Sequence, residues 1–219
     1  MFNLPAFRFL LLLLSADFVF IIISIGYQFT DVIAFDFYSL ETDRGYAEIF
    51  QYIKEFWIVF LLILYYVRNR QWIYLIWAGL FAYLLIDDSF MVHEELGNFF
   101  SGYFHFLHRG GLRPEDFGQL LASCLFGLPF LLVIGFAYTR CLSTHKPIIK
   151  TLFKLLLVYI LFGIGVDMFH SMANYFKILQ FTFPTMEDGG EMLVMSVMVW
   201  YVYMLHERDD NPVYVQNKN

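Results

Sequence analysis

Residues 6–27, AFRFLLLLLSADFVFIIISIGY, form an almost unbroken apolar run near the start of the chain. Arg8 and Asp17 are its only charged residues. An α-helix needs about 20 apolar residues to cross the hydrocarbon core of a bilayer, and this run has that length. Because it is too long for the apolar core of a signal peptide and lacks a small-residue cleavage site, we expect a retained first transmembrane helix.

The composition extends this interpretation to the whole chain. Of 219 residues, 59% are hydrophobic and 16% charged, whereas soluble domains contain about 25% charged residues. The sequence therefore predicts an all-α, polytopic membrane helix bundle of about six transmembrane helices. We expect a single transmembrane domain over residues 1–208 and a polar cytoplasmic tail over residues 209–219. The five further apolar runs of spanning length are residues 49–67, 72–94, 116–139, 148–172 and 185–206.

The basic residues predict how these helices are oriented. With six crossings, nine lysines and arginines fall on the side of the two termini and five on the other side. Because cytoplasmic loops carry an excess of basic residues, we expect an inner-membrane protein with cytoplasmic N and C termini. The outer connections, residues 30–50 and 97–117, are rich in aromatic residues and suit short interfacial helices. The net charge of −6, without a cluster of basic residues, argues against nucleic acid as a partner.

Ionisable residues gather at the outer ends of the third, fifth and sixth predicted helices. The densest stretch is LLIDDSFMVHEEL at residues 84–96. Charged groups inside a membrane are costly, usually face the bundle interior and often mark a functional site. Together the three helix ends contain Asp87, Asp88, His93, Glu94, Glu95, Asp167, His170, Glu187, Asp188 and Glu191.

Helical spacing places several of these residues on a shared face. At 100° per residue, Asp87 and Glu94 differ by about 20°, and Glu187 and Glu191 by about 40°. On a continuous helix His93 lies about 120° from Asp87, so either the helix ends there or His93 faces a different neighbour. Small residues that would let the fifth and sixth helices approach their neighbours closely are Gly163, Gly165, Gly189 and Gly190.

The combination of carboxylates and imidazoles predicts a metal site. Like charges at close range need either protons or a compensating cation. Mixed carboxylate and imidazole ligands suit zinc, iron or manganese, and Asp167 and His170 have the i, i+3 spacing found in di-iron bundles. We expect Glu94 and Asp87 to act as acid/base groups beside a divalent metal ion. The predicted metal ligands are Asp88, His93, Asp167, His170, Glu187 and Glu191.

The alternative is a hydrogen-bonded network of carboxyl groups, with Lys54 or Lys177 neutralising part of the charge. In that case Asp17 is either a proton relay or a structural group. Lys54 and Glu55 are interpreted as residues near the outer interface. His105 and His108 could close over the site, although their aromatic surroundings are more typical of an interfacial segment.

Two short motifs resemble known proteins. LIDDSFMVHEELG (85–97), taken with EDGGEML (187–193), resembles a loosely defined group of uncharacterised bacterial multi-pass membrane proteins and implies no activity. The sequence is also formally similar to alkaline-ceramidase-like membrane hydrolases, which gather an Asp, a Ser and several His around zinc at helix ends. That resemblance implies comparable roles for Asp88, His93 and His170. The sequence departs from this group at one point: the group has paired C-terminal histidines, and Glu187 and Glu191 stand in their place here.

These observations rank three functions. P-loop, GxSxG, HExxH and CxxC motifs are absent from the sequence, so the enzyme classes that use them lack support. The first hypothesis is a metal-dependent membrane hydrolase or oxidoreductase acting on a lipid or other amphiphile. The alternatives are a proton- or cation-coupled transporter and a non-catalytic or haem-binding subunit. The inner halves of the third and fifth predicted helices are almost wholly apolar, which favours a one-sided site over a transport path.

Overall fold

The computed structural model describes residues 4–30, 35–109, 111–166 and 179–210. Over these residues it contains helices and no extended strand, which confirms the all-α prediction. Two short elements accompany the α-helices: a 3-10 helix, η1 (Asp36–Tyr38), and a π-helix, η2 (Leu161–Val166), which continues α6. The α-helices are α1 (Leu4–Phe29), α2 (Tyr46–Asn69), α3 (Trp72–Phe90), α4 (Val92–Phe104), α5 (Pro114–Arg140), α6 (Lys146–Ile160) and α8 (Leu179–Asp210).

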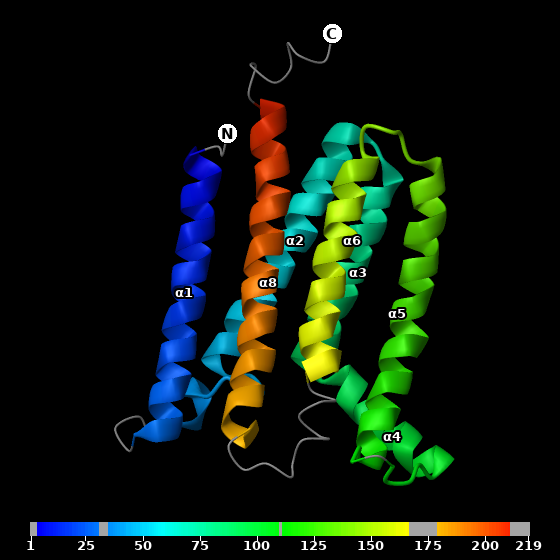
Figure 1. Cartoon of the computed structure of the whole chain (residues 1–219). Coiled ribbons are helices and arrows are strands. Elements are labelled where there is room, and N and C mark those ends of the chain that lie inside the picture. The colour runs from blue at the N-terminus through cyan, green and yellow to red at the C-terminus, as the bar shows by residue number, and fades with distance from the viewer. Residues whose placement is uncertain (1–3, 31–34, 110, 167–178, 211–219) are drawn as a thin grey trace.

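The long helices lie side by side and alternate in direction (Figure 1). α1 begins and α8 ends at the same end of the bundle, as an even number of passes requires. The shorter α4 lies at the other end, which we call the α4 end, next to the start of α5. α2 packs against α3 and α8, α8 also packs against α1 and α6, and α5 packs against α3 and α4.

Four helical stretches are long and apolar enough to cross a membrane, which indicates a membrane-embedded protein. They are Pro5–Phe29, Trp72–Phe90, Pro114–Arg140 and Lys146–Val166. The helices α2 and α8 are equally long but less apolar, with charged residues such as Lys54 in α2 and Glu191 in α8. They run beside the other four (Figure 1), so all six predicted helices are present as one bundle. Part of the predicted fifth helix, residues 167–172, and residues 211–219 of the predicted tail lie outside the described residues.

The bundle has the polarity expected of a membrane protein. Large apolar side chains lie on its outer surface, including Leu12, Leu132 and Phe136, each more than half exposed. Its interior contains an apolar core around Trp77 and Phe81 of α3, and this core fills the bundle away from the α4 end. Polar groups that a soluble protein would expose are here turned inward. The fully buried polar residues are Asp17, Ser24, Lys54, Glu55 and Ser196.

The third predicted span, residues 72–94, is interrupted before its end. α3 ends at Phe90, and Met91 adopts the left-handed conformation (φ 55°, ψ 37°) before α4 begins at Val92. The Met91 N–H donates to backbone carbonyls of the last turn of α3, which closes that helix. Glu94 and Glu95 then lie in the first turn of α4, where carboxylates are favourable. The prediction that Asp87 and Glu94 share one helical face was therefore wrong, because they belong to different helices.

Glycines permit close approach at three places. A Cβ on Gly118 of α5 would collide with the backbone of Gly97 in α4, so these two helices touch through their main chains. A Cβ on Gly163 would collide with the Glu191 carboxylate, and one on Gly190 with the Phe162 ring. The predicted role of Gly163, Gly189 and Gly190 in helix packing is confirmed, since Gly189 also faces Ile21 of α1. Gly165 differs, because its Cβ would meet only Leu161 of the same helical segment.

Candidate functional site

Three predicted site residues meet where α3 gives way to α4. Asp87 and Asp88 lie in the last turn of α3, and His93 lies in the first turn of α4. One ligand atom of each lies within 4.8 Å of the others. The left-handed Met91 turns the chain and brings His93 Nδ1 to 3.3 Å from Asp87 Oδ2. The structure thus decides the question that spacing left open: the helix ends, and His93 faces Asp87.

The geometry of this cluster suits a metal ion. Two ligands on one tetrahedral zinc lie about 3.4 Å apart, given bond lengths of about 2.0–2.1 Å, and the Asp87–His93 separation is similar. Asp87 is only 6% exposed. Its Oδ1 atom has no hydrogen-bond partner among the described residues. A buried acceptor without a partner destabilises the fold, and a bound cation would remove that cost.

The neighbouring residues of α4 have shifted acid/base properties. Burial lowers the pKa of His93, but the carboxylates of Asp87, Asp88 and Glu94 more than offset this, so its pKa lies above the ordinary 6.5. Burial raises the pKa of Glu94, and the nearby Asp43 carboxylate raises it further. A carboxyl group whose pKa moves toward neutrality is suited to proton transfer.

A cavity of about 870 Å³ opens around these residues. Six α-helices and η2 contribute to its wall. Among the described residues of its wall, the one arginine is Arg113, which is paired with Asp116 at 2.8 Å at the start of α5. The cavity is therefore strongly acidic. The ten carboxylate residues that line it are Glu41, Asp43, Glu48, Asp87, Asp88, Glu94, Asp116, Glu187, Asp188 and Glu191.

The wall of the cavity changes character along the bundle. Most of the carboxylates come from the segments nearest the α4 end, whereas the residues one or more turns farther into the bundle are mostly apolar. These include Leu80 and Leu84 on α3, Leu131 on α5, and Leu156 and Ile160 on α6. An acidic region continuous with an apolar one has the polarity of a site for an amphiphile.

The remaining predicted site residues fall into three groups. Glu94, Glu187 and Glu191 line the same cavity but lie outside the group of three. Asp167 and His170 lie outside the described residues. His105 and His108 are exposed and do not line the cavity, as their interfacial setting predicts.

Sequence reasoning missed the contribution of α2. Glu48, Gln51 and Tyr52 line the cavity, and the neighbouring Lys54 and Glu55 are fully buried. The Glu55 carboxyl group faces that of Asp88 on α3. The signal was present in the sequence: these polar residues recur at helical spacing within a long apolar run.

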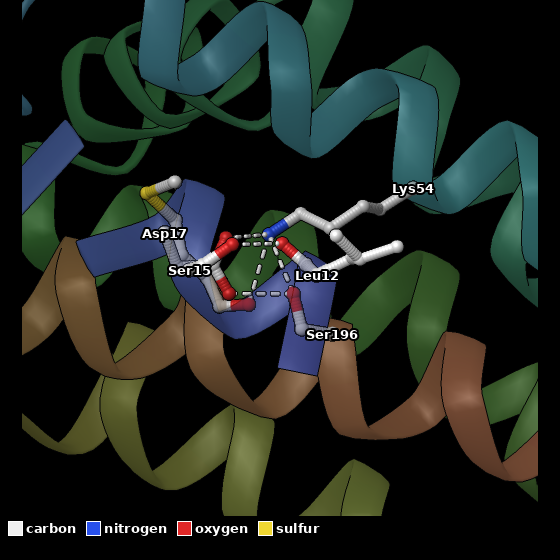
Figure 2. A network of polar contacts seen from close by, with 6 residues as sticks. Leu12, Ser15, Asp17, Lys54 and Ser196 are labelled. Carbon is white, nitrogen blue, oxygen red and sulfur yellow. Dashed lines mark hydrogen bonds and ion pairs between the residues drawn. The ribbon is translucent and has the colours of Figure 1, made fainter. Parts of the chain in front are cut away.

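Lys54 belongs to a separate buried network, which we call the Asp17 network (Figure 2). Its Nζ lies 3.0 Å from Asp17 Oδ1 and donates to the Met192 carbonyl at 2.8 Å. Ser196 Oγ donates to Asp17 Oδ2 at 2.5 Å. These contacts join α1, α2 and α8. Of the two roles considered for Asp17, a proton relay and a structural group, this setting favours the structural one, and Lys54 is its ion-pair partner.

Comparison with known proteins identifies a family for this chain, but the description of that family states no activity. The family described as a domain of unknown function (DUF8692) matches residues 6–206. No curated protein and no solved structure matches the chain. The similarities to other membrane proteins noted from short motifs therefore stay resemblances.

Proposed function

This chain belongs to the DUF8692 family, whose description states no activity, and we propose from its geometry that it is a metal-dependent membrane enzyme. It binds a divalent ion at Asp87, Asp88 and His93 and uses that ion on an amphiphile held in the adjoining cavity. One observation carries the proposal: donor atoms of these three residues converge within 4.8 Å. The buried Asp87 Oδ1, which has no hydrogen-bond partner among the described residues, supports it.

The surrounding residues have distinct roles in this proposal. Three protein ligands leave a coordination position open, as in catalytic metal sites. A divalent ion there would supply a Lewis acid or an activated water. Glu94, whose pKa is raised, lines the same cavity and would transfer the proton. Carboxylate and imidazole ligands together suit zinc, iron or manganese.

The geometry favours an enzyme over the two alternatives. A transporter needs polar groups that continue to the opposite end of the bundle, where the described residues form an apolar core. Asp17 and Lys54, which could extend a path inward, are paired with each other. A haem-binding subunit would show a Soret band on purification, which makes that alternative simple to test.

The proposal also includes an orientation. We place the protein in the inner membrane with both termini in the cytoplasm, which puts the α4 end and the cavity on the outer side. The unequal distribution of basic residues supports this orientation. A phosphatase that is active only in the periplasm should be inactive when it is fused after residue 219, because the fusion would lie in the cytoplasm. An active fusion would overturn the orientation.

The deciding experiment measures bound metal and its effect on stability. Purified protein should contain stoichiometric zinc, iron or manganese by elemental analysis. Chelation should lower the melting temperature in detergent, because an ion at about 100 times its Kd stabilises by about 2.7 kcal/mol. Asp87→Asn and His93→Gln should abolish the response to chelator.

His108→Gln is the matched control, since it removes an exposed histidine that does not line the cavity. It should keep the wild-type metal content and the full response to chelator. A metal-free preparation whose melting temperature ignores both chelator and added ions would overturn the metal proposal.

A further inference from the structure

The acidic cavity contains acceptors that lack donors. Gln51 Oε1 and Asp87 Oδ1 both line it, belong to residues 6% exposed, and have no hydrogen-bond partner among the described residues. A divalent ion at the metal site satisfies Asp87 and leaves Gln51 Oε1 without a donor. Among the described residues, ten carboxylate residues and one arginine line this cavity, so acidic side chains outnumber basic ones. A ligand for this cavity must therefore bring hydrogen-bond donors and positive charge.

The apolar part of the cavity lies between α5 and α6. α5 stands at one edge of the bundle (Figure 1) and packs on α3 and α4. Near the turn that joins α5 to α6, Lys146 Nζ lies 5.4 Å from the centre of the Tyr138 ring. Farther along, both helices line the cavity, through Gly127 and Leu131 of α5 and Leu156 of α6 among others.

Gly127 marks open space in that part of the wall. A Cβ built on Gly127 would meet no atom within 4 Å. The α5 surface around it is strongly apolar, and α5 is the least buried of the four apolar spans. A hydrocarbon chain can therefore occupy the region between α5 and α6 without burying a polar group.

We propose that the ligand of this cavity is an amphiphile with a primary ammonium headgroup and a single hydrocarbon chain. The headgroup lies among Gln51, Glu48 and the carboxylates of the cavity nearest the α4 end. The chain lies along Gly127 and Leu131 between α5 and α6. This assignment rests on the proposed function, because it names the substrate class of the same site. An ammonium supplies both the positive charge and the N–H donors that the acceptors lack.

The test compares two amphiphiles with the same hydrocarbon chain length and headgroups of opposite charge. The protein is placed in nanodiscs of phosphatidylcholine with a spin-labelled octadecylammonium or the matched spin-labelled octadecanoate. The immobilised fraction of each is measured by electron paramagnetic resonance. The ammonium should bind at least about tenfold more tightly, because the acidic region attracts one headgroup and repels the other. Equal binding, or a preference for the carboxylate, would overturn the proposal.

Two glycine variants on α5 test where the chain lies. Gly127→Leu fills the open space and should weaken ammonium binding at least about tenfold. Gly135→Leu is the matched control: its Cβ also meets no atom within 4 Å, but Gly135 does not line the cavity, so binding should be unchanged. Both changes favour the helix, since glycine is a poor helix former. Should Gly127→Leu not fold, Ser123→Phe blocks the same wall.

Metal binding is measured on the same variants so that the two proposals can fail separately. Gly127→Leu should keep the chelator-dependent shift in melting temperature. If the metal response is present but the amphiphiles bind equally, the substrate assignment is wrong and the metal site stands. If ammonium binding is selective but no variant responds to metal, the proposed enzyme is wrong and the cavity is a binding site for cationic amphiphiles. Unchanged ammonium binding by Gly127→Leu would overturn the placement of the chain.

Discussion

Two buried polar regions of this bundle treat their charges in opposite ways. In the Asp17 network, Lys54 contacts a carboxylate, a carbonyl and a hydroxyl, and all the side chains involved are fully buried. In the acidic cavity, Asp87 Oδ1 and Gln51 Oε1 have no hydrogen-bond partner among the described residues. The consecutive residues Lys54 and Glu55 differ in the same way: Lys54 is paired with the Asp17 carboxylate, whereas Glu55 faces a second acidic group, Asp88.

The difference indicates which polar groups build the bundle and which bind ligands. A buried charge whose partners all come from the chain contributes to packing and needs nothing from outside. A buried acceptor that lacks a partner keeps its capacity to bind a cation or a donor. The first kind joins α1, α2 and α8, and the second kind lies on α2 and in the last turn of α3, where these helices line the cavity.

The largest expected effect comes from breaking the Asp17 network. Lys54→Met leaves the Asp17 carboxylate buried without its cation and should destabilise the protein by about 3–5 kcal/mol. The double variant Lys54→Met, Asp17→Leu removes both charges and should recover most of that loss. Denaturant unfolding in detergent measures both. A single variant as stable as wild type would show that the network contributes nothing to stability.

A smaller effect is expected where α4 packs on α5. Gly118→Ala forces the α4 backbone away from α5 and should cost about 1–3 kcal/mol. Because α4 contains His93, the variant should also lose the metal-dependent shift in melting temperature while the Asp17 network stays intact. Gly127→Ala on the same helix meets open space and should be neutral or slightly stabilising. Retention of the metal response by Gly118→Ala would show that the α4–α5 contact does not position the site.

Substitution of Glu55 should change the stability of the protein in the opposite direction to substitution of its neighbour Lys54. Glu55→Leu removes a fully buried carboxyl group whose neighbour is a second carboxyl group, Asp88, and should raise the free energy of unfolding of the metal-free protein by about 1 kcal/mol. Thermal melts with chelator present measure this change. Destabilisation comparable to that of Lys54→Met would mean that Glu55 belongs with the structural charges.

The smallest expected effect is a change with pH at His93. Although burial lowers its pKa, facing carboxylates from α3, Asp87 and Asp88, and from its own helix, Glu94, raise it above 6.5. Stability from a raised histidine pKa is fully present below the unfolded pKa and is lost as pH rises through the folded pKa. The metal-free protein should therefore lose a little stability as pH rises above 6.5.

The metal-loaded protein should gain stability over the same pH range, because the ion replaces the proton on the imidazole. Melting curves across this range, with chelator in one series and metal in the other, measure the two slopes. His93→Gln should flatten both of them. Parallel slopes in the wild-type protein would argue against a metal ligand at His93.

The sequence predicted several features correctly because they depend on local composition. Apolar runs of spanning length identify helices wherever they pack, and their number places the start of α1 and the end of α8 together. The acidic pair before His93 also stood out, since such charges are rare after an apolar run. Glu187 and Glu191 were expected near the start of the sixth helix and they line the cavity, although α8 begins earlier, at Leu179.

Only the tertiary structure decided which of these groups meet. Asp17 and Lys54 are 37 positions apart, and their contact depends on how α1 and α2 are rotated against α8. The turn at Met91 places a non-glycine residue in the left-handed region, which local preference disfavours. It persists where α4 packs through Gly97 onto Gly118. Helix rotation and register come from packing between segments distant in sequence, so periodicity along one helix could locate the polar residues but could not pair them.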